Sequence, residues 1–287
     1  MPREDDGEPA PRSARVRQLN TESIMIKTEI GYTTIDTITV RGKDLSSEIL
    51  GKMDFVETMM LTILNRVPDE REKRMVNLIL VTACDHGLTP SAMSARLTYL
   101  GAPEAMQAAV AAGLLGAGSV FLGTTQNSAE MLIEAAKELG DDASEAELLA
   151  CARAAIQRAK EKKQPIYGVG HPIHVNGDPR VATLAGASRE NGYYGKHWRL
   201  MVAIERVFRE ELGKALPINA VGAIGAIIGD MGLDPLLARG FMLVGRAAGL
   251  IGHLYEERQQ PVGQALWDLV LQQDPRNEIP VRTPKQK

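Results

Sequence analysis

Aromatic residues, cysteines and a strong net charge are all scarce or missing in this 287-residue chain. Aromatic residues make up only 4% of it, although hydrophobic residues reach 44%. Aliphatic and small side chains must therefore fill the core, and small residues let helices pack closely. The net charge is −3, and we find no long Lys/Arg patch. Because nucleic-acid binding depends on neutralising phosphates, we expect no nucleic-acid partner.

The only two cysteines, Cys84 and Cys151, lie in apolar stretches with a helical pattern. We expect reduced core thiols rather than a disulfide, which fits a reducing, cytoplasmic compartment. No uninterrupted apolar run reaches the roughly 18 residues that a membrane span requires, so we expect no membrane partner. Residues 1–20 begin with an acidic, proline-rich segment without an apolar signal core, and we expect a disordered tail there.

Helical periodicity dominates the rest of the sequence. Residues 24–40 alternate weakly and predict a short N-terminal hairpin, and Asp44 begins a helical pattern. Ser144 and Glu147 match a capping box, and Asp234-Pro235 marks another helix start. Further helices are expected at 54–65, 69–84, 91–100, 103–117, 145–163, 196–212, 217–231, 235–257 and 265–272. The pattern predicts an all-α fold of about ten helices.

The stretch 164–179 interrupts this helical pattern. It contains three prolines and three glycines and has no helical period, which predicts an irregular loop. Long irregular loops inside compact domains are often functional. We therefore treat this loop as part of a candidate site.

Five histidines are candidates for acid–base chemistry. His197 lies at a charged helix start, where we expect a surface residue. His253 lies among apolar helical neighbours, where we expect a core residue whose ring is hydrogen-bonded. His174 lies in the loop, and its local sequence does not indicate whether it is functional. His86 follows a helix and precedes a glycine, so its ring can project into a cleft. His171 ends a Gly-Val-Gly-His segment whose glycines let the backbone approach a ligand.

The sequence predicts no metal site and no bound cofactor. The histidines lack helical ligand spacing, and the His171/His174 pair has no companion carboxylate or cysteine motif. A Walker phosphate loop, a dinucleotide GxGxxG and a GxSxG nucleophile elbow are absent. Lys160, Lys162 and Lys163 precede the loop, and a solvated helix end favoured by the helix dipole explains them better than phosphate binding.

Four segments carry a resemblance to a known family. They are Ala83-Cys84-Asp85-His86-Gly87; Gly168-Val169-Gly170-His171 with Asp178-Pro179-Arg180; Asn219 with Gly222-Ala223-Ile224-Gly225; and Gly245-Arg246 through Gly249-Leu250-Ile251-Gly252-His253. In this order and at this spacing they resemble the citrate synthase-like superfamily, and most closely the citryl-CoA lyases. The similarity covers roughly residues 30–265.

The resemblance implies a fold and a domain division. The family fold is all-α, with a small helical domain inserted into a large one, and it dimerises. Here the large domain is expected at 21–123 and 221–287, and the small domain at 124–220. The substrate is expected in the cleft between them, where closure excludes water and strengthens charge interactions. A homodimer or higher homo-oligomer is the implied assembly.

The resemblance also implies residue roles. His86 and His171 are expected to bind the hydroxyl or carbonyl and the carboxylates of a citrate-like group, with His171 as the main acid–base group. Arg180 and Arg246 are expected to grip carboxylates, because a guanidinium fork matches carboxylate geometry. Backbone atoms of the loop are expected to take the adenine side of CoA; the residues concerned are Pro165, Ile166, Tyr167, Gly168 and Gly170.

Two departures from the family pattern concern catalytic positions. Leu122 stands where citrate synthases have a histidine, and the citryl-CoA lyases also lack that histidine, so this difference favours a lyase. Val221 stands at the family's catalytic aspartate and cannot transfer a proton. Loss of such a group typically costs about 10²–10⁴-fold in rate. Asp230 lies more than two helical turns further on and is expected to point elsewhere, so Asp85 is our candidate substitute.

Two further departures remove cations. Pro172 stands where many relatives have an arginine after the loop histidine. Gln260 stands where an arginine reaches the site from the second subunit of relatives. With fewer carboxylate clamps, a substrate with fewer carboxylates than citrate fits the chain as well.

Three functions follow from these observations. The favoured one is a carbon–carbon lyase that cleaves citryl-CoA, or a related 3-hydroxy-3-carboxyacyl-CoA, to acetyl-CoA and a 2-oxo acid such as oxaloacetate. The second is the reverse chemistry, a condensing synthase for an acyl-CoA and a 2-oxo acid. The third is a non-catalytic member that binds CoA esters or hydroxy acids, which Val221 and Leu122 favour. In each case the partners are a CoA thioester and a carboxylic acid.

Overall fold

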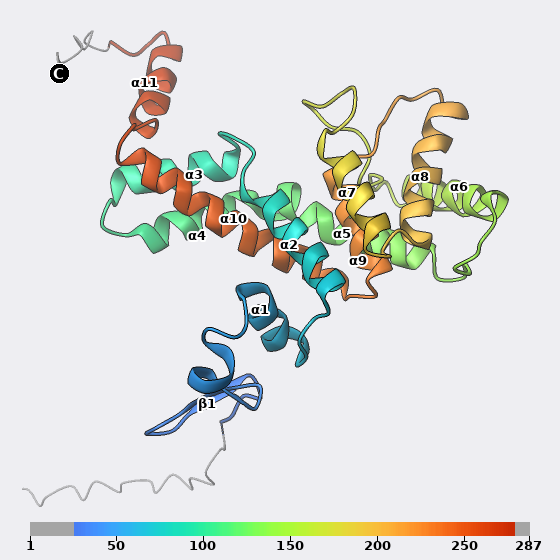
Figure 1. The fold of residues 1–287 in the computed structure, drawn as a ribbon. Helices are drawn as coiled ribbons and strands as arrows, with labels where there is room; N and C mark the ends of the chain where they lie inside the picture. Colours follow the sequence, from blue (N-terminus) through green and yellow to red (C-terminus); the bar gives the residue numbers. More distant parts are fainter. Residues whose placement is uncertain (1–25, 279–287) are drawn as a thin grey trace, which may run out of the picture.

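The computed structural model describes residues 26–278, and most of the regular structure in that range is helical (Figure 1). The family expectation of an all-α fold is confirmed. The disordered tail expected at residues 1–20 lies outside the described residues. The hairpin expected within 24–40 is present and gains a third strand. Strands β1 (Gly31–Thr33), β2 (Ile38–Val40) and β3 (Lys43–Asp44) form an antiparallel sheet in that order.

The short sheet leads into the first helical segments. Asp44 accepts a hydrogen bond from the Ser47 N–H and caps a π-helical turn, Leu45–Ile49. Asp54 forms a capping box with Glu57 at the start of α1 (Phe55–Leu64). The Arg41 guanidinium donates two hydrogen bonds to the Thr62 carbonyl near the end of α1. The sheet is thereby tied to α1, which lies between the sheet and α2 in Figure 1.

Most of the remaining helices follow the expected positions closely. The remaining helices are α2 (Glu70–Cys84), α3 (Pro90–Gly101), α4 (Met106–Ala117), η2 (Gly118–Leu122), α5 (Gly123–Ala135), α6 (Glu145–Glu161), α7 (Arg180–Glu190), α8 (Lys196–Glu210), α9 (Ala220–Asp230), α10 (Pro235–Glu257) and α11 (Gly263–Gln273). Helices α5 and α7 were not predicted. The first turns of α5 are polar, with five consecutive residues from Thr124 to Ser128, so they hide its apolar period.

Helix α10 is central to the packing around the site. It contacts α2, α3, α4, α5 and α9. Its crossing with α2 depends on two glycines: a Cβ built on Gly249 lies 1.6 Å from the Cys84 carbonyl oxygen, and one on Gly245 lies 2.3 Å from the Leu80 carbonyl oxygen. No side chain fits at that approach. The close crossing brings the end of α2, where Asp85 and His86 follow, against α10.

The expectation that His197 is a surface residue is wrong. His197 is 8% exposed, and its Nδ1 lies 2.8 Å from Asp230 Oδ1. The Asp230 carboxylate also accepts the N–H groups of Gly195, His197 and Trp198, so it caps the start of α8 from the end of α9. Gly229 leaves room for the imidazole, since a Cβ there would lie 2.6 Å from His197 Cγ. The sequence shows neither the long-range cap nor this space.

The two thiols are free, as expected, but neither lies fully in the core. Cys84 and Cys151 are free thiols, each only partly buried. Two helical stretches, Met106–Ala135 and Pro235–Glu257, are long and apolar enough to cross a membrane by length and composition. These helices contain scattered polar residues, so neither forms the unbroken apolar run on which the sequence expectation was based. Both stretches lie in the packed helical assembly, and core helices pass the same test.

Candidate active site

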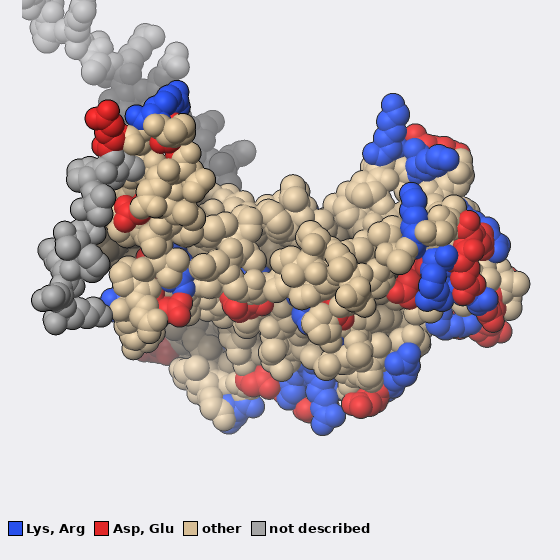
Figure 2. All heavy atoms as spheres, turned by 90° about the horizontal axis from the view of Figure 1, so that it is seen from above, with Lys and Arg blue, Asp and Glu red and all other residues tan. Residues whose placement is uncertain are grey.

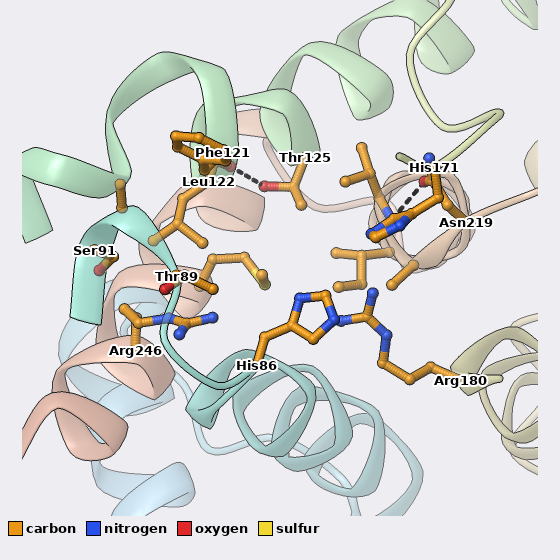
Figure 3. Close-up of a pocket in the computed structure, with 15 residues that line it drawn as sticks. His86, Thr89, Ser91, Phe121, Leu122, Thr125, His171, Arg180, Asn219 and Arg246 are labelled. Atoms are coloured by element: carbon orange, nitrogen blue, oxygen red, sulfur yellow. Dashed lines mark hydrogen bonds between the residues drawn. The ribbon is translucent and has the colours of Figure 1, made fainter. Parts of the chain in front are cut away.

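A cavity of about 150 Å³ lies where the end of α2, the segment from η2 into α5, the 164–179 loop, the start of α9 and the middle of α10 meet. All four residues expected to bind a carboxylic acid line it: His86, His171, Arg180 and Arg246. Figure 3 shows their side chains around one space, although they come from four separate parts of the chain. The structure thus brings together the residues that the sequence singled out.

His86 is held by a network behind it. Gly87, two residues past the Asp85 C-cap of α2, has a φ of +72°, and its N–H donates to Asp85 Oδ2. Asp85 Oδ1 lies 2.8 Å from His253 Nε2, and the opposite nitrogen of His253 accepts from Arg96 Nε at 3.1 Å. Burial raises the pKa of Asp85, but the hydrogen bonds from Gly87 and His253 outweigh it and leave that pKa below its ordinary value.

Asp85 does not line the cavity. Its two oxygens are engaged with His253 and the Gly87 N–H. The geometry therefore gives no support to the hypothesis that it substitutes for the missing aspartate. His253 is a partly buried, hydrogen-bonded residue, as its apolar helical context suggests; its side chain is 11% exposed.

The 164–179 loop is pinned to the start of α9. Asn219 caps α9 through its side-chain oxygen and donates from Nδ2 to the Gly170 carbonyl at 2.5 Å. The Asn219 N–H donates to the Gly168 carbonyl at 3.0 Å. Gly168, with a φ of +98°, sits directly against Gly222, and a Cβ on it would come within 2.4 Å of the Gly222 Cα. The two glycines permit the contact that places His171 over the start of α9.

His171 is oriented by the backbone of its own loop. Its Nδ1 accepts the N–H of Ile173 at 3.1 Å and the N–H of His174 at 3.0 Å. A nitrogen that accepts two N–H groups carries no proton, so the neutral ring carries its proton on Nε2. Burial lowers the pKa of His171, and the positive charge of a protonated His174 lowers it further. The neutral ring is therefore a hydrogen-bond donor at Nε2.

His174 joins the two predicted histidines, which the sequence did not reveal. Its Nε2 lies 3.2 Å from His86 Nε2, and its ring centroid lies 4.5 Å from that of His171. The ligand nitrogens of the three rings lie within 4.8 Å of one another, close enough to share one metal ion. Two features oppose a divalent ion: the proton on His171 Nε2, and the guanidiniums of Arg180 and Arg246 in the same cavity. The cluster suits proton transfer better.

Arg180 is already paired. Its Nε and Nη2 donate to the two oxygens of Asp178 at 2.9 and 2.7 Å, and the Asp178 carboxylate also accepts the Ala220 N–H. Burial raises the pKa of Asp178, but Arg180 and the backbone donors hold it well below its ordinary range. This pair joins the start of α7 to the start of α9. Arg180 therefore brings a partly neutralised charge to the cavity.

Arg246 differs in having no such partner. It is 7% exposed, and its Nε and Nη1 are buried without a hydrogen-bond partner among the described residues. Burial lowers its pKa, while Asp85 and Cys84 act in the opposite direction. A buried donor without an acceptor costs about 1–3 kcal/mol, and more when it is charged. A bound carboxylate would supply the missing acceptors.

A family model described as "Citrate synthase, C-terminal domain" matches residues 10–266. The chain belongs to the citrate synthase family. Citryl-CoA lyase from Hydrogenobacter thermophilus has a similar structure, with a TM-score of 0.73 and 29% identity over 92% of this chain and 97% of that one. The family and the likeness to a citryl-CoA lyase, expected from four segments, are confirmed.

More distant relatives share the fold. ATP citrate lyase from Methanothrix soehngenii, in complex with citrate and coenzyme A, has a TM-score of 0.69 and 22% identity over 100% of this chain and 47% of that one. Citrate synthase from Acidithiobacillus ferridurans is 26% identical over 67% of this chain and 48% of that protein. Citrate synthase 2 from Bacillus subtilis is 26% identical over 70% of this chain and 51% of that protein. The chain spans about half the length of the curated relatives it matches.

Two cavity positions that the family resemblance singled out carry apolar side chains. Leu122 and Val221 both line the cavity. None of the described residues that line it is an aspartate or a glutamate. Three hydroxyl residues that were not expected from the sequence also line the cavity: Thr89, Ser91 and Thr125. Thr89 has a recognisable signal as the N-cap of α3, but nothing local shows that it faces this space.

A second, more open cleft of about 440 Å³ lies between α5, α6 and the start of the loop. Pro165 and Tyr167, two of the residues expected to contact CoA, line it together with Gln164. Arg158 and Lys162 contribute cations. The Lys162 side chain, expected to be only a solvated helix end, thus lies at a cleft wall.

Proposed function

We propose that this chain is a carbon–carbon lyase that cleaves citryl-CoA, or a related 3-hydroxy-3-carboxyacyl-CoA, to acetyl-CoA and a 2-oxo acid. One observation carries the proposal: the buried Arg246 guanidinium, with two nitrogens lacking partners among the described residues, lines the same cavity as two imidazoles and Arg180. Such a constellation suits a carboxylate next to a hydroxyl or carbonyl group.

The cavity suits the acid part of the substrate, and the CoA part must extend beyond it. At about 150 Å³ the cavity is small. We assign the adenine side of CoA to the loop backbone at Pro165, Ile166, Tyr167, Gly168 and Gly170. The neighbouring cleft supports this assignment, because Pro165 and Tyr167 line it beside two cations that can meet phosphates.

The domain division is part of the same proposal. With the large domain at 21–123 and 221–287 and the small one at 124–220, His86 and Arg246 come from the large domain. His171 and Arg180 come from the small one. Closure of one domain on the other would then tighten all four contacts and remove water from the site.

The apolar residue at position 122 favours cleavage over condensation, because the citryl-CoA lyases, by resemblance, also lack the histidine that citrate synthases have there. In cleavage an imidazole takes the hydroxyl proton, the carbon–carbon bond breaks, and the acetyl-CoA enolate leaves. Condensation is the exact reverse and needs the same proton transfer at the thioester carbon, which Val221 cannot perform in either direction. The apolar lining from Leu122 and Val221 offers no carboxylate for that step.

The test is incubation of the purified protein with citryl-CoA. We expect acetyl-CoA and oxaloacetate to appear, with oxaloacetate followed by reduction with NADH and malate dehydrogenase. Arg246→Gln should lower kcat/KM by about 10²-fold or more, because the variant loses a buried charged hydrogen-bonding group. Arg153→Gln is the matched control, since Arg153 pairs with Glu211 outside the cavity. Equal rates for the two variants would contradict the assignment.

Two other functions are outcomes of the same experiment. Thiol release from oxaloacetate plus acetyl-CoA, without cleavage of citryl-CoA, would identify a condensing synthase, the activity named for the curated relatives. No turnover in either direction, with a thermal shift on adding a CoA ester, would identify a non-catalytic binder. Val221 at the family's aspartate position is the observation that favours the binder. A gain in rate in Val221→Asp would show that the proton-transfer group is truly missing.

We further propose that two copies of the chain associate. Helices α3 and α4 and the following η2 expose a group of large apolar side chains: Leu97, Leu100, Met106, Leu115, Val120 and Phe121. Leu115 is 82% exposed and Val120 is 75% exposed. Exposed apolar clusters of this kind mark interaction sites. Figure 2 shows charged side chains gathered most densely towards the end with α6 and α8, while the middle of the face in view is largely uncharged.

A further inference from the structure

His174 has no role in the function proposed so far. It is not among the residues that line the cavity, and its ring stacks on that of His86 with centroids 5.4 Å apart and an interplanar angle of 23°. Its Nε2 is 3.2 Å from His86 Nε2. Two imidazole nitrogens at this distance share one proton, so one ring donates and the other accepts.

His171 cannot remove a proton from the substrate through Nε2, the ring nitrogen that faces no backbone donor. Its Nδ1 accepts two backbone N–H groups, so in the neutral ring Nε2 already carries a proton. Protonation of Nδ1 would place an N–H group opposite these two N–H donors, which is unfavourable. Within the cavity, neutral His171 is a hydrogen-bond donor to the substrate oxygen. This differs from the role that family resemblance suggests for it.

The nearby carboxylates are engaged elsewhere. Asp85 bonds to His253 and the Gly87 N–H, Asp178 bonds to Arg180 and the Ala220 N–H, and Asp230 caps α8. No aspartate or glutamate is among the described residues that line the cavity. The proton acceptor for a substrate hydroxyl must then be His86, the other imidazole in the lining.

We infer that His174 is a positioning residue that accepts a hydrogen bond from His86 Nε2 and leaves His86 Nδ1 free as the base for the substrate hydroxyl. The inference rests on the proposed function for its chemistry. The reverse arrangement would put a proton on His86 Nδ1 and add another donor to a cavity that already holds His171 Nε2–H and two guanidiniums. Only the first arrangement offers an acceptor, and a base oriented by a second side chain is an effective one.

The proton balance of cleavage closes with this pair alone. The hydroxyl O–H bond breaks and its proton goes to His86 Nδ1, while the Nε2 proton is shared with His174. The oxygen becomes the new carbonyl, and the electrons of the broken carbon–carbon bond form the acetyl-CoA enolate. His86 then returns the proton to the enolate carbon, which becomes the methyl group. No carboxylate at position 221 is needed.

Other charges face the pair. Burial lowers the pKa of His86, and Arg180, a protonated His174 and Arg246 lower it further, whereas Asp178 raises it. These groups oppose a full positive charge on His86 alone. A neighbouring ring that shares the proton therefore matters most at the moment when His86 has accepted it.

The direct test is NMR of the imidazole nitrogens in ¹⁵N-labelled full-length protein, which does not depend on activity. We expect His171 and His86 both to carry their proton on Nε2, with the His86 signals changing in His174→Ala. Ile173→Ala is the matched control, because Ile173 is 72% exposed in the same loop and keeps its backbone N–H. A proton on His86 Nδ1, or His86 signals unchanged in His174→Ala, would overturn the inference.

The kinetic test uses the same variants with citryl-CoA. His174→Ala should lower kcat at least about 10-fold while KM stays within about twofold, because the orientation of the base acts on the chemical step. His174→Gln should recover part of the rate, since its amide oxygen can accept from His86 Nε2–H. Equal kcat in His174→Ala and wild type would overturn the catalytic role. If wild type cleaves no citryl-CoA, the proposed function fails while the NMR result still decides the pairing.

Discussion

Single residues in the cavity carry their function through hydrogen bonds made elsewhere. Two backbone N–H groups decide which nitrogen of His171 holds the proton. The Asp85–His253–Arg96 network fixes the turn that carries His86, and buried Arg96 is itself paired with Glu257 at 2.6 Å. Arg246 is the exception, since its Nε and Nη1 have no hydrogen-bond acceptor among the described residues. The chemistry of the site is thus set by partners that most sequence motifs do not include.

The two cavity histidines predict a pH dependence of stability. The pKa values of His86 and His171 are both below the ordinary value of 6.5. The unfolded chain therefore binds more protons than the folded one once the pH falls below about 6.5, and the free energy of unfolding must fall with it. Urea unfolding at fixed protein concentration between about pH 7.5 and about pH 5.5 measures this.

The double variant His86→Gln, His171→Gln is the comparison for that measurement. Its free energy of unfolding should depend less steeply on pH over the same range. Carboxylates with lowered pKa values, such as Asp85 and Asp178, lose their contribution only as the pH approaches about 4 and below, so they do not mask the effect. Identical slopes for variant and wild type would refute the assigned cause.

At the scale of elements, the site depends on how closely α2, α9, α10 and the loop approach one another. Glycines set these distances: Gly245 and Gly249 on α10 against α2, and Gly222 on α9 against Gly168. The 164–179 loop has no regular structure of its own and takes its position from Asn219 and these contacts. The glycines thus set the distances between these elements, and the charged residues of the site take their places from those distances.

Gly249→Ala tests this directly. Its Cβ would overlap the Cys84 carbonyl, so α10 and α2 must separate, and we expect a loss of at least about 2 kcal/mol in the free energy of unfolding. Gly252→Ala, in the same helix, meets nothing within 4 Å and should raise stability by about 0.5–1 kcal/mol through helix propensity. Thermal or urea unfolding compares the two, and similar effects would contradict the packing argument.

At the scale of the whole molecule, the exposed apolar cluster on α3, α4 and η2 is adjacent to the cavity. Phe121, in η2, both lines the cavity and is 51% exposed. Association through this surface would therefore cover one wall of the site. The proposed second copy would also bury apolar area that the single chain leaves in contact with water.

The prediction for the assembly is a particle of twice the 31.1 kDa chain mass in light scattering coupled to size exclusion. Leu115→Glu should shift it towards the single chain, because a charge would be buried in the interface. Leu212→Glu, at the end of α8 away from this surface, should leave the mass unchanged; Leu212 is 46% exposed. A single-chain mass for wild type would rule out the proposed association.

Sequence patterns were sufficient for the elements with strong local signals. Capping residues and apolar periods located the ends of α2, α6, α9 and α10 to within a few residues. They failed for α5, whose polar first turns conceal its period, and for α7, which follows directly on the irregular loop. His197 was misplaced because the carboxylate that buries it comes from another helix. Each failure involves partners that are distant in the sequence.

The sequence by itself determined the helical class, the family and the four side chains around the cavity, because these follow from local periodicity and from motifs with fixed spacing. Only the tertiary structure decided which charges remain unpaired, which nitrogen of His171 carries the proton, and that His174 pairs with His86. The physical reason is the same in each case. Charge state and hydrogen bonding depend on neighbours in space, and the helix crossings that create these neighbours join residues up to 168 positions apart.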